Sequence, residues 1–161
     1  MSVRAVLYAA LAALAACSPM SADAGQKASA TGSTRHPLSE LEVVPLTIAA
    51  ANGRHAFRVE VARSGEDQAK GLMFRTAMGT DEGMIFPMEP ARQASFWMKN
   101  TVIPLDLVFI GPDKRIESIA ANAVPYSLAP ISSKGGVSAV LELNGGRAAQ
   151  LGLAPGDKVS W

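Results

Sequence analysis

The stretch that most constrains the fold is residues 95–110, which read Ser-Phe-Trp-Met-Lys-Asn-Thr-Val-Ile-Pro-Leu-Asp-Leu-Val-Phe-Ile. Apolar residues occupy both alternating faces of its second half, which predicts a central strand that is buried on both sides. One carboxylate, Asp106, interrupts this apolar run. An ionised group in such a strand is costly unless it is paired or hydrogen-bonded, so Lys99 and the amides of residues 99–101 are candidate partners.

The rest of the chain predicts a mainly β domain. Further strands are expected at residues 41–50, 54–61, 83–86, 115–120 and 137–143, with a last strand ending at Trp161. Two short helices are expected, one from the capping pattern at Ser64 to Gly71 and one at 147–151. Proline and glycine predict loops at 87–93 and 121–136. A length of 161 residues accommodates one domain. We therefore expect a single compact β-barrel or sandwich-like domain over residues 39–161.

The N-terminal segment predicts export. Arg4 precedes an apolar run at 6–16 that closes with Leu14-Ala15-Ala16-Cys17, and this pattern resembles a bacterial lipoprotein signal. The interpretation makes residues 1–16 a signal peptide and Cys17 a lipidated N-terminus, anchored in the cell envelope and facing the periplasm. An ordinary secretory signal cut near the same small residues is the alternative. Residues 17–38 hold few large apolar groups and predict a flexible tether, while the choice between inner and outer membrane stays open.

Charge and cysteine content exclude some classes of function. The chain has 15 Lys and Arg against 14 Asp and Glu, so it lacks the basic field of a nucleic-acid-binding protein, and no nucleic-acid partner is expected. A single cysteine excludes an intramolecular disulfide and any multi-cysteine metal site.

Several segments of the chain together resemble one family. They are Gly71-Leu72-Met73-Phe74-Arg75, Gly83-Met84-Ile85-Phe86, Phe96-Trp97-Met98-Lys99-Asn100-Thr101, Ile103-Pro104-Leu105-Asp106, Val140-Leu141-Glu142 and Gly156-Asp157. This set resembles the domain of unknown function 192 (DUF192) family of small, often exported bacterial and archaeal proteins. The resemblance implies a compact β-rich domain and no particular reaction.

The candidate site consists of polar residues in apolar surroundings together with one aromatic residue: Arg75, Trp97, Lys99, Asn100, Asp106 and Glu142. In one interpretation they form a buried structural network, in which Asp106 and Glu142 pair with Arg75 or Lys99. In the other they converge at one mouth of the barrel and bind a small polar or anionic ligand, with Trp97 as a stacking wall. A partner protein in the envelope is the alternative to a small ligand at this site.

The residue content of the chain is compatible with two further functions. A hydrolase could use Asp106 and Glu142 as acid and base, but the chain has no serine nucleophile elbow and no cysteine outside the lipid site, so no catalytic residue is assigned. A Cu(I) site could use the thioethers of Met73, Met78, Met84, Met88 and Met98. Methionine also fills gaps in cores, and no metal or cofactor is expected. We therefore expect a binding or interaction module rather than an enzyme.

Overall fold

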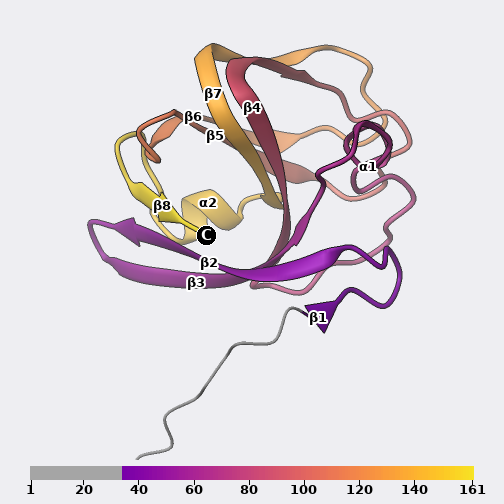
Figure 1. Cartoon of the computed structure of the whole chain (residues 1–161), viewed down its shortest axis with the longest axis horizontal. Coiled ribbons are helices and arrows are strands. Elements are labelled where there is room, and N and C mark those ends of the chain that lie inside the picture. The colour runs from indigo at the N-terminus through magenta and orange to yellow at the C-terminus, as the bar shows by residue number, and fades with distance from the viewer. Residues whose placement is uncertain (1–33) are drawn as a thin grey trace, which may run out of the picture. The chain divides into compact units, whose positions relative to one another are not determined.

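The structure is a computed structural model that describes residues 34–161, so the expected signal peptide and Cys17 lie outside the described residues. The elements, in chain order, are β1 (Thr34–Arg35), β2 (Glu42–Ala50), β3 (Gly53–Val61), α1 (Gly65–Lys70), β4 (Glu82–Phe96), β5 (Leu105–Ile110), β6 (Ile116–Ala123), β7 (Ile131–Asn144), α2 (Arg147–Gln150) and β8 (Lys158–Ser160) (Figure 1). The predicted fold class, mainly β with two short helices, is confirmed. Within this part of the chain no helix has the length and apolarity to span a bilayer.

The strands form one strongly curled sheet in the order β1-β2-β3-β4-β7-β5-β6. Neighbours run antiparallel except β3 and β4, which run parallel. Strand β8 pairs with β2, where Val159 lies opposite Ile48. Lys158 of β8 also bridges to Arg115, directly before β6. The sheet therefore curls into a half-barrel, and β8 links its two sides.

Strands β4 and β7 are longer than the sequence predicted. They span 15 and 14 residues, and they include all of the expected loop at 87–93 and the end of the one expected at 121–136. The loop prediction for 87–93 is therefore wrong. The register of β4 against β7 shifts between Pro87, which lies opposite Ala139, and Arg92. Pro90 therefore lies in an irregular stretch where the ladder does not need its missing N–H group.

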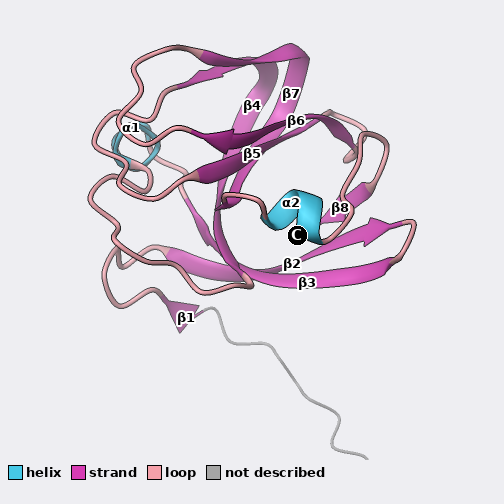
Figure 2. Cartoon of the chain, turned by 180° about the vertical axis from the view of Figure 1, so that it is seen from behind, coloured by secondary structure: helices cyan, strands magenta, loops and turns pink. Residues whose placement is uncertain are grey.

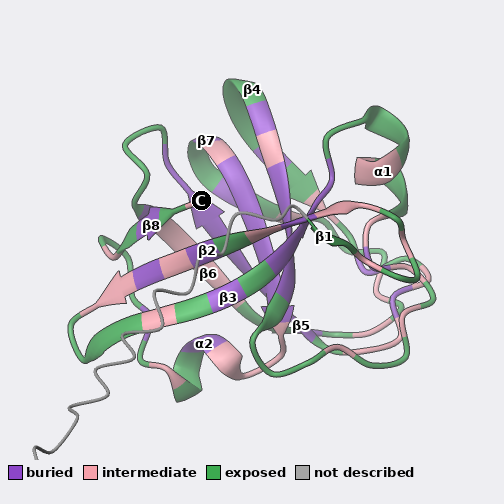
Figure 3. Cartoon of the chain, turned by 60° about the horizontal axis from the view of Figure 1, so that its bottom comes forward, coloured by how far each residue is buried: buried purple, intermediate pink, exposed green. Residues whose placement is uncertain are grey.

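The central position predicted for β5 is confirmed. The strand lies between β7 and β6, and all six of its residues are buried. Val108 and Ile110 belong to an inner core that also contains Ala148 of α2, while Leu107 and Phe109 belong to an outer core on the opposite face. Figure 2 shows α2 in the hollow of the curled sheet and α1 away from it, and Figure 3 shows buried residues along β4, β5 and β7. Two cores on one sheet explain why both faces of β5 are apolar.

Helix α1 begins and ends as its sequence predicts. The Ser64 hydroxyl accepts a hydrogen bond from the backbone N–H of Asp67 at 3.0 Å. At the other end Gly71 has a positive φ of 48° and its N–H donates to the carbonyl oxygen of Asp67 at 2.7 Å. The helix therefore stops at Lys70, and the chain turns down toward the outer core.

Candidate functional site

The two strand carboxylates lie on opposite faces of the sheet. In the pairing of β5 with β7, Leu107 lies opposite Glu142, whereas Asp106 lies opposite Leu143. Side chains alternate along a strand, so Asp106 points to the inner side and Glu142 to the outer side. The structure therefore separates the acid and base of the hydrolase hypothesis by the thickness of the sheet.

Asp106 is fully buried and is held by backbone amides. Its Oδ1 accepts from the N–H groups of Asn122 at 2.8 Å and Gly146 at 2.9 Å, and its Oδ2 accepts from Ala148 at 2.8 Å. Gly146 is the N-cap of α2 and has no side chain to cap it, so Asp106 performs this role from β5. The predicted pairing of Asp106 with a cation, or with the amides of 99–101, is wrong because β6 and the start of α2 supply the donors.

Arg75 pairs with Glu60, a buried residue of β3. The two guanidinium nitrogens donate to the two carboxylate oxygens at 2.9 and 3.1 Å. The Ser39 hydroxyl also donates to Glu60, and His36 Nδ1 lies 3.6 Å from the same carboxylate. Residues 34–39, at the end of the expected tether, thus cover this pair. The predicted pairing of Arg75 with a carboxylate of β5 or β7 is therefore wrong.

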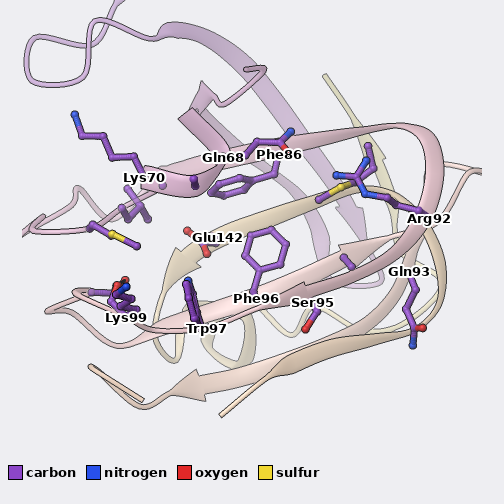
Figure 4. A pocket seen from close by; sticks show the side chains of 17 residues that line it. Gln68, Lys70, Phe86, Arg92, Gln93, Ser95, Phe96, Trp97, Lys99 and Glu142 are labelled. Carbon is purple, nitrogen blue, oxygen red and sulfur yellow. Dashed lines mark hydrogen bonds between the residues drawn. The ribbon is translucent and has the colours of Figure 1, made fainter. Parts of the chain in front are cut away.

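A cavity of about 390 Å³ opens on the outer side between α1 and the end of β4 (Figure 4). Its lining includes Gln68, Lys70, Leu72, Met73, Phe86, Met88, Arg92, Gln93, Ser95, Phe96, Trp97, Lys99, Thr101 and Glu142. Of the residues predicted for the site, the cavity brings together Trp97, Lys99 and Glu142. Asn100 lies just outside the lining, where its amide contacts the Met73 sulfur at 3.8 Å.

Glu142 forms the floor of this cavity. It is 5% exposed, and its Oε2 has no hydrogen-bond partner among residues 34–161. Burial raises the pKa of Glu142 from 4.5 to about 8, because desolvation disfavours the ionised form. At neutral pH the group is therefore mostly a neutral carboxylic acid, which can donate one hydrogen bond and accept others. Figure 4 shows its carboxyl group pointing into the cavity between α1 and Trp97.

Aromatic side chains and cations surround this carboxyl group. The rings of Phe86 and Phe96 meet edge to face with their centroids 5.0 Å apart. Trp97 is half exposed, and Lys99 Nζ lies 5.2 Å from the centroid of its ring. The other charged residues of the lining, Lys70 and Arg92, are also cationic. The cavity therefore combines apolar walls and a positive mouth with a protonated acid at its floor.

Comparison with known proteins identifies a family for this chain. The DUF192 model, described as "Uncharacterized ACR", matches residues 47–161. The chain belongs to the DUF192 family. Every residue that lines the cavity falls inside the matched region. No curated protein matches this DUF192 chain.

Two crystal structures are similar to this DUF192 domain. A protein of unknown function from Novosphingobium aromaticivorans DSM 12444 is 56% identical, with a TM-score of 0.80, over 82% of this chain and 94% of that chain. A protein from Sinorhizobium meliloti 1021, described as a candidate transcription regulator, is 42% identical with a TM-score of 0.70, over 72% of this chain and 91% of that chain.

The methionines proposed for Cu(I) are distributed as core residues in this DUF192 domain. Met84, Met88 and Met98 are buried in the outer core, and Met78 packs against it. Met73 lines the cavity beside α1. The part of the chain that the structure describes contains no group of three His, Cys, Asp or Glu residues that could hold a metal ion. Packing accounts for the positions of the buried thioethers.

Proposed function

We propose that this DUF192 domain binds a small organic anion in the cavity above Glu142. The observation that carries the proposal is the buried carboxyl group whose Oε2 lacks a partner and which points into the cavity. Leaving a buried polar atom without a hydrogen bond costs about 1–3 kcal/mol. A ligand that bonds to Glu142 recovers this cost.

The charges of the lining favour an anion over a cation. Lys70, Arg92 and Lys99 attract negative charge to the mouth, and the protonated Glu142 donates a hydrogen bond to it. A cationic ligand would pass three positive side chains before reaching the floor. Trp97 offers a flat apolar face at the entrance. The cavity volume falls near the lower end of the range for small-molecule sites, which is roughly 300–1,000 Å³. A planar ring that carries a carboxylate fits these features.

Calorimetric titration with ring probes of matched size and different charge tests the proposal. Benzoate should bind at least about tenfold more tightly than benzyl alcohol or benzylamine at pH 7, a difference of about 1.4 kcal/mol. Glu142→Leu should abolish benzoate binding, whereas Glu82→Gln, an exposed change outside the cavity, should leave it unchanged. Above pH 8 the affinity should fall about tenfold per pH unit as Glu142 loses its proton. Tighter binding of benzylamine, or no benzoate binding at millimolar concentration, would contradict the proposal.

The proposed cellular location is the bacterial envelope, with the domain anchored by lipid on Cys17 and facing the periplasm. The support is the Leu14-Ala15-Ala16-Cys17 pattern after an apolar run. Mass spectrometry of the protein from a membrane fraction should find lipid on Cys17, and Cys17→Ser should release the protein into the soluble fraction. An unmodified Cys17 in membrane-derived protein would refute the anchor. The net charge of +1 gives no support for a nucleic-acid role.

A further inference from the structure

Exposed large apolar side chains gather on the loops at one end of the domain. They are Leu38, Phe74, Trp97, Val124, Tyr126 and Leu128, each at least 51% exposed. Backbone hydrogen bonds hold these loops together. Phe74 N–H donates to the Asn100 carbonyl at 2.8 Å, and Tyr126 N–H donates to the Thr101 carbonyl at 3.2 Å. The loops carrying Phe74, Trp97 and Tyr126 therefore meet around residues 97–101, and we call this region the loop end.

The backbone fixes these side chains in their exposed positions. Phe74 has a φ of 63° and Tyr126 a φ of 62°, both in the left-handed region. This conformation costs a residue other than glycine roughly 1–2 kcal/mol, and it persists only where surrounding contacts impose it. Asn100, between the two loops, has a φ of 56°. The loop end thus holds two aromatic residues outward at a cost in stability, which is typical of binding surfaces.

The charged residues that line the two cavities beside the loop end are mainly positive. Lys70 and Lys99 are exposed, and the ammonium group of Lys99 lies against the ring of Trp97. A second cavity lies beside the loop end, and its acidic residue is Asp67. This carboxylate accepts a hydrogen bond from the Ser64 hydroxyl at 2.6 Å. Exposed aromatic and aliphatic side chains flanked by lysines are characteristic of protein surfaces that enter the headgroup region of a bilayer.

Leu38, close to the start of the described residues, also belongs to the loop end. The described chain begins at Thr34, and Leu38 shares a second cavity with Lys70 and Phe74. We propose that the loop end docks on an anionic lipid bilayer, with its apolar side chains among the headgroups and its lysines on the lipid phosphates. Trp97, Lys70 and Lys99 also line the Glu142 cavity, so docking turns the mouth of that cavity toward the lipid.

Two variants with one tryptophan each test the orientation in the full chain. Trp161→Phe leaves Trp97 as the reporter, and Trp97→Phe leaves Trp161, which packs beside β8 at the inner core. The N-terminal segment is the same in both, so any difference reports how the domain lies on the vesicle. With phosphatidylglycerol vesicles that carry brominated chains, we expect strong quenching and a blue shift for Trp97 and little change for Trp161. Lys70→Ala and Lys99→Ala should each weaken the partitioning about fivefold.

Several outcomes would overturn the docking proposal. Equal quenching of both tryptophans, or no quenching of Trp97, would show that the loop end does not contact lipid. Equal quenching of Trp97 by phosphatidylglycerol and phosphatidylcholine vesicles would show that the lysines do not contribute to docking. The fluorescence of Trp97 could also shift to the blue with rising protein concentration in the absence of vesicles. That result would assign the surface to a second copy of the chain. The docking does not depend on the anion site, because Glu142→Leu should abolish benzoate binding and leave the quenching of Trp97 unchanged.

Discussion

Replacing Glu142 by glutamine should remove a pH-dependent loss of stability from the domain. The pKa of this carboxyl group is about 8 in the folded protein and close to 4.5 when the chain is unfolded and the group is hydrated. The folded state therefore holds a proton that the unfolded state releases between these two values. Its stabilising effect is complete below pH 4.5 and is lost as the pH rises toward 8.

The size of the effect follows from the two pKa values. Each pH unit inside the window costs about 1.4 kcal/mol, so the wild type should lose roughly 3–4 kcal/mol of unfolding free energy from this group between pH 5 and pH 8. Glutamine does not titrate, and its own unpaired amide adds an offset that is independent of pH. The difference in stability between Glu142→Gln and the wild type should therefore grow by this amount over the range.

Urea unfolding followed by far-ultraviolet circular dichroism at pH 5, 6, 7 and 8 measures this difference. Comparison of the two proteins at each pH cancels the titration of all other groups. Glu82→Gln serves as the matched control, because that side chain is exposed and its change should run parallel to the wild type. A constant difference between Glu142→Gln and the wild type would refute the raised pKa, and with it the neutral acid at the floor of the cavity.

Three further changes test the buried contacts by urea or thermal unfolding. Asp106→Asn turns an amide nitrogen toward a backbone N–H of the 146–148 segment and should cost about 2–4 kcal/mol. Arg75→Met leaves Glu60 buried without its cation and should cost about 3–5 kcal/mol, and adding Glu60→Gln should restore part of the loss; no restoration would contradict the pairing. Gly83→Ala places a Cβ 2.6 Å from a carbonyl oxygen of β7 and should cost about 1–3 kcal/mol, whereas Gly136→Ala, in open space, should cost far less.

Local patterns in the sequence predicted the features that depend on local physics. The apolar residues on both faces of 105–110 identified β5 as a central strand, and the Ser64 cap and Gly71 identified the ends of α1. The prolines at 87 and 90 were misleading, because a shift in register lets β4 continue past missing N–H donors. A pattern of alternation alone does not show whether the neighbouring strand is paired regularly.

Features that depend on distant segments were not predictable from one strand at a time. The two amides of the 146–148 segment that hold Asp106 come about 40 residues later in the chain, after α2 has folded back onto the inner core. Glu60 is buried because residues 34–39 and Arg75, which lie outside its own strand, cover it. Glu142 was recognised as an acid between leucines, yet only the register of β7 against β5 shows that it points to the opposite side from Asp106.

The cap on α2 has a consequence for local motion. A helix of four residues is too short to persist alone, and its first amides are tied to a carboxylate in the most buried strand of the sheet. The backbone N–H groups of Asn122, Gly146 and Ala148 should therefore exchange with solvent deuterium as slowly as those of β5, although Asn122 lies near the end of its strand and the other two lie at the start of a four-residue helix. We expect this one carboxylate to make three separate segments open and close as a single cooperative unit.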